Sequence, residues 1–142
     1  MGGTHKDMSI TEIGGTTVTL ELIAKWLKYI RNISLSWIHG SELTAPTGSL
    51  VSKVVGSGKK GYVYGVIITA SEANKFYLNW TSGGAAMKIS FQLSARGTLL
   101  YVFEIPLNEG YSADAGTAIS ISVATAGSSG STYQAGFLYG EI

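Results

Sequence analysis

Residues 62–70 read YVYGVIITA and residues 76–80 read FYLNW, and these two stretches decide the fold class. The first is almost continuously apolar, a pattern typical of a strand that is covered on both faces. In the second, Phe76, Leu78 and Trp80 alternate with more polar residues, which is the period of a strand with one buried face. Together they predict a β-sheet protein.

The same kind of pattern continues on both sides of these stretches. Further strands are expected at residues 33–37, 50–55, 87–93, 98–104, 119–123 and 133–139. Turns rich in glycine, serine and asparagine bound most of them, and no βαβ rhythm interrupts the series. The sequence therefore predicts a mostly β protein, an antiparallel β-sandwich of jelly-roll type with about eight strands. An immunoglobulin-like sandwich, which needs one strand fewer, is the alternative.

One segment, at about residues 19–32, has the spacing of an N-terminal amphipathic helix. Its apolar face is predicted to consist of Leu20, Ile23, Trp26, Leu27 and Ile30. Thr19 is the expected N-cap. Such a helix packs on its own β-domain, against its copies around a symmetry axis, or on a membrane surface, and the residues leave all three arrangements open. The second arrangement makes the five apolar residues an oligomer interface.

The sequence divides into two parts. Residues 1–16 are polar and end soon after two adjacent glycines, so we predict a flexible N-terminal arm. Residues 17–142 are predicted to form a single domain, with the helix at about 19–32 and the β-sandwich at about 33–142. The first residues lack the hydrophobic region of a signal peptide, and no stretch approaches about 18 apolar residues. We therefore expect a chain that is made in soluble form and has no membrane span.

The composition favours a folded protein that associates with other subunits. Of 142 residues, 45% are hydrophobic and only 13% are charged, about half the usual charged share. A surface with so few charges is coated by small polar residues and tyrosine, or it is covered by another subunit. The net charge is +1 without a basic stripe, so we expect no nucleic-acid partner. The absence of cysteine excludes disulfides and thiolate metal sites.

Residues that could carry chemistry are few and scattered. His5 and His39 are the two histidines, and their surroundings in the sequence do not supply a set of metal ligands, so we expect neither a metal site nor a cofactor. The serines lack the strand–turn–helix context of a nucleophile. Glu104, Glu109 and Asp114 cluster around one loop, where each is expected to cap a turn or to face solvent. We predict a non-catalytic protein; a β-sandwich hydrolase or lyase using Glu104, Glu109 and His39 is the enzymatic alternative.

Tyrosine is the enriched residue type, with eight copies, most of them on or beside the expected strands. Its ring gives contact area and its hydroxyl gives one hydrogen bond, a combination that suits both protein interfaces and sugars. Tyr77, Trp80 and Tyr133 are the surface-binding candidates, and a carbohydrate-binding protein would expose them together on one sheet face or at loop tips. Ordinary packing between neighbouring strands is the alternative role of the tyrosines.

Several segments between residues 61 and 142 follow one another in a characteristic order: GYVYGVIITA, FYLNW, ISFQL, FEIPLNEG, GTAISISVATAG and GFLYG. This order resembles the small jelly-roll structural proteins of tailed phages and archaeal viruses, such as capsid decoration, spike and fibre-head proteins. The resemblance covers about the last 80 residues, and the expected helix has no counterpart in it. It implies a homo-oligomer, often a trimer, that sits on a larger assembly with other virion proteins.

The residues and the resemblance lead to one functional expectation. We predict a non-catalytic viral structural protein, a capsid decoration, spike or minor capsid component, which self-associates on a virion or extracellular particle surface. The helix or the arm is expected to make the anchoring contact. A carbohydrate-binding β-sandwich module is the alternative, and its partners are glycans.

Overall fold

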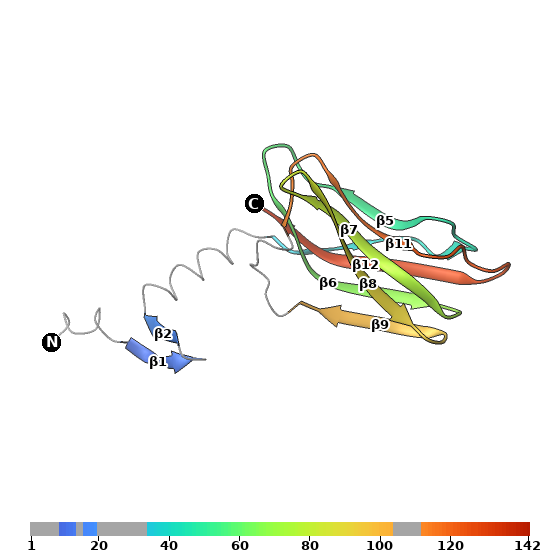
Figure 1. The fold of residues 1–142 in the computed structure, drawn as a ribbon, viewed down its shortest axis with the longest axis horizontal. Coiled ribbons are helices and arrows are strands. Elements are labelled where there is room, and N and C mark those ends of the chain that lie inside the picture. The colour runs from blue at the N-terminus through green and yellow to red at the C-terminus, as the bar shows by residue number, and fades with distance from the viewer. Residues whose placement is uncertain (1–8, 14–15, 20–33, 104–111) are drawn as a thin grey trace. The chain divides into compact units, whose positions relative to one another are not determined.

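The computed structural model describes residues 9–13, 16–19, 34–103 and 112–142 (Figure 1). The chain divides into two compact units, Met1–Ser34 and Leu35–Ile142. Every regular element among the described residues is a β-strand, and all strand pairs are antiparallel. The prediction of a mostly β, antiparallel protein is therefore confirmed.

The described part of the first unit is one antiparallel pair of strands, β1 (Ser9–Ile13) and β2 (Thr16–Thr19). β2 reads TTVT, and β-branched residues of this kind favour extended backbone. The sequence predicts a flexible arm over residues 1–16, yet β1 lies within that range and Thr19, the expected N-cap, ends β2. The remainder of the predicted helix, residues 20–32, lies outside the described residues.

The second unit contains two antiparallel sheets, and the first of them is called the β6 sheet. Its strands are β3 (Ser36–His39), β4 (Leu43–Thr44), β6 (Gly61–Ala70), β9 (Gly97–Val102), β10 (Ser112–Ala113) and β12 (Thr132–Glu141). β6 and β12 pair with each other along most of their lengths. β9 and β10 pair with β6, whereas β3 and β4 pair with β12, so the central pair is flanked on both sides.

The second sheet is called the β7 sheet. Its strand order is β5 (Ser49–Val54), β11 (Ala118–Val123), β7 (Asn74–Ser82) and β8 (Ala85–Leu93). β7 and β8 form a hairpin, and its turn is the Gly83-Gly84 pair that the sequence predicts. Both glycines have positive φ, as a two-residue turn of type I′ requires.

The hydrophobic core is shared by the two sheets. Its most deeply buried side chains are Val66, Ile68, Tyr133 and Phe137 from the β6 sheet and Phe76, Leu78, Ile119 and Ile121 from the β7 sheet. Burial of one Val, Leu, Ile or Phe side chain contributes about 1.5–3 kcal/mol relative to exposure in water. This common core therefore holds the sheets together as a β-sandwich.

The burial pattern of the central strands confirms the sequence pattern. Phe76, Leu78 and Trp80 are buried, while the residues between them along β7 are only partly buried. Residues 61–66 of β6 are buried without interruption, as the continuous apolar run predicts, but Ile67 is only partly buried and Thr69 is exposed, so the second face of β6 is covered along the first part of the strand only.

The sequence pattern at residues 33–37 predicts the wrong set of side chains to face the core. The sequence pattern places Leu35 and Trp37 on the buried face, but they are 50% and 41% exposed. Ile38 packs against the core instead, because β3 pairs with β12 so that Ile38 lies opposite the buried Phe137. Side chains alternate along a strand, so this register turns Trp37 outward.

Candidate interaction surface

The outer face of the β6 sheet, on the side away from the core, carries exposed apolar side chains. Val66 and Ile68 of β6 are buried in the core, so Ile67 between them lies on the outer face. The strand pairing then determines which residues of β9, β12 and β3 lie beside it.

Outward residues of the β6 sheet form rows across the strands. The first row is Val102, Gly65, Leu138 and Trp37, the second is Leu100, Ile67, Gly136 and His39, and the third is Thr98, Thr69 and Gln134. The first two rows together are called the outer apolar face. The third row is polar, so the sheet surface changes from apolar to polar along the strands.

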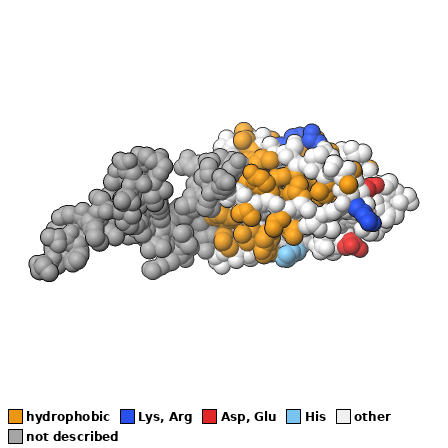
Figure 2. All heavy atoms as spheres, turned by 90° about the horizontal axis from the view of Figure 1, so that it is seen from below, with side chains coloured by type: hydrophobic (Ala, Val, Ile, Leu, Met, Phe, Trp, Pro, Cys, Tyr) orange, Lys and Arg blue, Asp and Glu red, His pale blue; other side chains and the backbone are white. Residues whose placement is uncertain are grey.

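The side chains that β9 and β3 contribute to the outer apolar face are exposed, whereas Ile67 and Leu138 between them are partly buried. Leu100 is 62% exposed and Val102 is 63% exposed. Figure 2 shows hydrophobic side chains gathered over one side of the sandwich, with the charged side chains toward the margins of that side. The three rows contain no Lys, Arg, Asp or Glu, and His39 is their single histidine. Exposed apolar patches of this kind mark binding sites for other proteins or surfaces.

A small hollow lies over Gly136 within this surface. Its volume is about 170 Å³, and His39, Ile67 and Gln134 are among its walls. A Cβ at position 136 would lie 2.9 Å from the carbonyl oxygen of Ile38, so the close strand approach requires glycine there. The hollow is smaller than the roughly 300 Å³ of ordinary small-molecule sites, and its size suits one side chain of a protein partner.

The outer face of the β7 sheet has the opposite character. The Asn79 side-chain amide donates hydrogen bonds to the hydroxyl oxygens of Ser122 and Ser120, at 3.0 and 3.4 Å. The ammonium group of Lys88 lies 4.4 Å from the centre of the Tyr77 ring, a cation–π contact. The sandwich therefore has one polar outer face and one apolar outer face.

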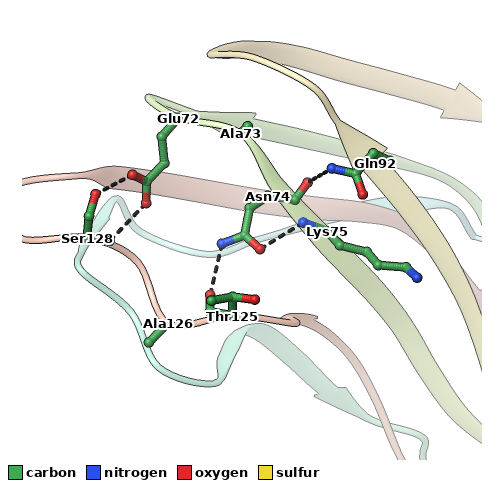
Figure 3. A pocket seen from close by; sticks show the side chains of 8 residues that line it. All are labelled: Glu72, Ala73, Asn74, Lys75, Gln92, Thr125, Ala126 and Ser128. Carbon is green, nitrogen blue, oxygen red and sulfur yellow. Dashed lines mark hydrogen bonds between the residues drawn. The ribbon is translucent and has the colours of Figure 1, made fainter.

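A polar pocket of about 410 Å³ lies at one end of the sandwich (Figure 3). Its lining consists of Glu72, Ala73, Asn74, Lys75, Gln92, Thr125, Ala126 and Ser128. These residues come from the β6–β7 turn, the start of β7, the end of β8 and the connection between β11 and β12. The volume is large enough for a small ligand, so the state of the polar groups decides what the pocket can bind.

The side chains of Glu72, Asn74, Gln92 and Ser128 in the pocket are hydrogen-bonded within the protein. The Glu72 carboxylate accepts hydrogen bonds from the Ser128 N–H at 2.9 Å, from the Ser128 hydroxyl and from the Tyr133 hydroxyl at 2.6 Å. The Asn74 side-chain amide donates to the Thr125 carbonyl and to the Tyr133 hydroxyl, both at 2.9 Å. These hydrogen bonds join the β6–β7 turn to the connection between β11 and β12. This structural role explains why the polar side chains are present.

The bonds also set the charge of Glu72. Hydrogen bonds to the carboxylate, from the Ser128 hydroxyl first and the Tyr133 hydroxyl second, lower the pKa of Glu72 to about 2. The side chain is therefore ionised at neutral pH. A general acid needs the opposite shift, so this carboxylate has the properties of an anchor for the Ser128 loop.

The residues considered for chemistry do not come together in the described part of the chain. His39 lies on the outer sheet surface, and Asp114 accepts hydrogen bonds from the Gly83 and Gly84 N–H groups at 3.0 and 2.8 Å. Glu104 and Glu109 lie outside the described residues. Across the described ranges, no group of three or more His, Asp or Glu side chains could hold a metal ion. None of the described elements is a helix of the length and apolar character that crossing a membrane requires.

The three surface-binding candidates do not share an exposed face, which corrects the sequence prediction. Trp80 is 6% exposed and Tyr133 is 1% exposed, and both belong to the core. Tyr77 is partly buried on the opposite side of β7 from Trp80, because residues three apart in a strand face opposite ways. The spacing of Tyr77 and Trp80 already contained this signal.

The five predicted interface residues of the helix, Leu20, Ile23, Trp26, Leu27 and Ile30, lie outside the described residues. The outer apolar face is a candidate interaction surface that the sequence pattern did not predict. A signal for part of it was present, because residues 98–102 read TLLYV without alternating polar residues. A strand that is apolar on both sides either lies inside a protein or has an outer side available for contact.

Comparison with known proteins gives no match. No family model matches the chain, and no curated protein and no solved structure is significantly similar to it.

Proposed function

We propose that the chain is a non-catalytic viral structural protein, of the capsid decoration, spike or minor capsid kind, which self-associates on the surface of a particle. The observation that carries this proposal is the outer apolar face, whose two rows cross four strands without a Lys, Arg, Asp or Glu. A surface of this composition is more stable when another subunit covers it than when it faces water.

The strand pairing supports a jelly roll as the finer description of the fold. The second unit has eight strands longer than two residues, from β3 as the first to β12 as the eighth in chain order. The first pairs with the eighth, the second with the seventh, the third with the sixth and the fourth with the fifth. A chain that forms one long hairpin and is then rolled into two sheets has this nested order.

The fold and the surface favour the same function. Jelly rolls are used by viral capsid proteins and by lectins. The segments of residues 61–142 resemble those of phage and archaeal-virus jelly rolls in their order. The polar outer face of the β7 sheet suits contact with water, so we place the outer apolar face toward the assembly.

The amphipathic segment at about residues 19–32 supplies a second contact in this proposal. Its interface residues are Leu20, Ile23, Trp26, Leu27 and Ile30, which recur with helical spacing in the sequence. The resemblance implies a trimer, and these residues are the ones that we expect around the three-fold axis.

The mass of the full chain in solution tests self-association. Light scattering after size-exclusion chromatography is expected to give a homo-oligomer. Trp37→Ser removes an exposed ring from the outer apolar face and is expected to lower the mean mass at a fixed concentration. Tyr77→Ser, on the polar outer face of the β7 sheet, is the control and is expected to leave the mass unchanged. A wild-type chain that stays monomeric at high concentration contradicts the proposal.

The virion location needs a separate test. Particles released by the organism that encodes the chain are separated from cells on a density gradient, and the proteins of the particle band are identified by mass spectrometry. We expect the chain in that band at many copies per particle. Recovery of the chain from the cell fraction alone contradicts a virion location, even for a chain that forms oligomers.

A carbohydrate-binding module is the second candidate, and one observation favours it. The Trp37 ring is exposed and stacks on the His39 ring, with ring centres 6.2 Å apart. His39 also lines the hollow over Gly136. Exposed aromatic rings with a polar neighbour are suited to stacking on sugar rings. Binding on a glycan array that disappears in Trp37→Ala would favour this candidate over the structural role.

A further inference from the structure

β9 is an edge strand with an unusual surface. It pairs with β6, and no other described strand pairs with it. Its sequence, GTLLYV, contains no charged residue and no proline, and its register with β6 runs from Gly97 to Val102 without a bulge. Leu100, Tyr101 and Val102 are all at least half exposed. Edge strands of this kind present open backbone groups to other chains.

The other described edge strands of the two sheets that are longer than two residues are protected by known devices. β5 carries Lys53 and has an irregular register with β11. β8 carries Lys88 near its middle. β3 is only four residues long and ends at His39. Charge, irregularity and short length all discourage edge-to-edge pairing, and β9 lacks each of them.

The direction of the open hydrogen-bonding groups on β9 follows from one bond. The Phe103 N–H donates to the Tyr64 carbonyl at 2.9 Å, so residue 103 faces β6. Backbone groups alternate in direction along an antiparallel strand, so Thr98, Leu100 and Val102 direct their N–H and C=O groups away from β6. The three open positions of β9 are therefore known.

We propose that β9 pairs with β9 of a second copy of this chain, antiparallel and around a two-fold axis that passes between the two Leu100 residues. The inference deepens the proposed function and rests on it, because it assigns the surface through which the copies associate. The contact is two-fold, so it is separate from a three-fold contact through residues 20–30 and can occur with it in one assembly.

This register satisfies the side chains and the backbone together. Residues directly opposite in an antiparallel pair point to the same face, so Leu100 lies opposite the partner's Leu100 and Thr98 lies opposite the partner's Val102. The same three residues carry the open backbone groups, and they would form on the order of six hydrogen bonds between the copies. A register shifted by one residue would place Leu100 opposite a residue of the inner face.

A second copy also suits the charge and the shape of this edge. β9 brings no charged side chain, so identical strands meet without like-charge repulsion. The two-fold axis is perpendicular to the sheet in this arrangement, and the outer apolar faces of both copies therefore lie on the same side of one continuous sheet. The joined surface is the one that the proposed function places toward the assembly.

A single-cysteine variant tests the register, because the natural chain contains no cysteine. Opposed residues of a hydrogen-bonded pair have Cα atoms about 5.5 Å apart, which a disulfide can bridge. Leu100→Cys is therefore expected to give a covalent dimer under mild oxidant, seen on a non-reducing gel. The control is Val54→Cys, on edge strand β5 with a similar exposure of 58%. Cross-linking of Leu100→Cys no faster than that of Val54→Cys would overturn the register.

A charge pair gives a second test, since residue 100 faces itself across the axis. Leu100→Lys and Leu100→Glu each place like charges together, and each is expected to weaken association at least about tenfold in sedimentation velocity. An equimolar mixture of the two variants is expected to regain the mass of the wild type. Leu100 is exposed, so circular dichroism should show both variants folded.

The outcomes separate this inference from the proposed function. A monomeric wild type overturns self-association as a whole. A wild-type oligomer that Leu100→Lys leaves intact overturns only the β9 pairing. Dissociation of both variants without recovery in the mixture also overturns the two-fold register, because opposite charges would then not meet.

Discussion

The Tyr133 hydroxyl donates a hydrogen bond of 2.6 Å to the carboxylate of Glu72. Tyr133 belongs to β12 of the β6 sheet, and Glu72 lies in the turn that leads into β7 of the other sheet. The same hydroxyl accepts a bond from the Asn74 amide at 2.9 Å. One buried phenol therefore joins the two sheets at the end of the sandwich where the polar pocket lies.

Removal of this phenol oxygen is the first test of that relationship. Tyr133→Phe keeps the ring in the core but leaves Asn74 and Glu72 without one partner each. We expect the free energy of unfolding to fall by about 1–3 kcal/mol, the usual effect of unpaired buried polar groups. Urea denaturation measures the change, and Tyr77→Phe on the outer face of the β7 sheet is the control. Equal effects of the two substitutions would mean that the bonds of Tyr133 add no stability.

The acid side of the stability curve tests the charge of Glu72. Its pKa lies at about 2 in the folded protein against an ordinary value of 4.5, because the Ser128 and Tyr133 hydroxyls bond the carboxylate. A lowered pKa contributes stability that is complete above pH 4.5 and is lost as the pH falls through 2. We expect Tm of the wild type to fall across this window more steeply than Tm of Glu72→Gln.

Two other carboxylates also make the stability depend on acid pH. Comparison of the wild type with Glu72→Gln separates their effect from that of Glu72. The pKa of Asp114 is lowered by the Gly84 and Gly83 N–H groups, and that of Glu141 by the Tyr139 hydroxyl and the Gly56 N–H. Both remain in Glu72→Gln, so its Tm still falls in acid. Parallel curves for the two proteins would show that Glu72 titrates alike in the folded and unfolded states.

The central strands could be predicted because their patterns are local. Phe76, Leu78 and Trp80 alternate within one strand, and the continuous run at residues 62–70 needs no partner to be recognised. Which side chains of β3 face the core could not be predicted in this way. Trp37 lies outward because Leu138, about 100 residues later, is its neighbour on β12.

The candidate surface depends even more on distant partners. The row of Val102, Gly65, Leu138 and Trp37 exists only after four separate strands have paired in one order. The polar pocket likewise depends on Glu72 meeting the Ser128 loop. Composition indicated that the chain has too few charges to cover itself, but only the strand order shows on which face the exposed apolar residues gather.

The hairpin turn between β7 and β8 gives a prediction about backbone conformation. Gly83 and Gly84 have φ values of 59° and 77°, and their N–H groups are held by the Asp114 carboxylate. Gly84→Val places a β-branched residue at positive φ and is expected to cost about 1–2 kcal/mol of stability. Gly83→Asn should be tolerated, because Asn-Gly is a preferred type I′ sequence. Equal Tm losses in the two variants would contradict a type I′ turn.

The Tyr64 hydroxyl presents the reverse of the Tyr133 case. It is buried and has no hydrogen-bond partner among the described residues, and burial, with a smaller effect of Tyr62, raises the pKa of Tyr64 to about 12. An unpaired buried hydroxyl costs stability, whereas a phenylalanine ring of the same shape does not. Tyr64→Phe is therefore expected to raise the free energy of unfolding by about 1 kcal/mol in urea denaturation.

The two tyrosine variants delete the same atom and should change stability in opposite directions. Tyr133→Phe removes an oxygen that is bonded to Glu72 and Asn74, while Tyr64→Phe removes one that is not bonded to any described residue. Both variants lose one phenol oxygen. The sign of the change in the free energy of unfolding therefore shows whether the deleted hydroxyl was hydrogen-bonded. A stability loss in Tyr64→Phe as large as that in Tyr133→Phe would mean that the Tyr64 hydroxyl is bonded in solution.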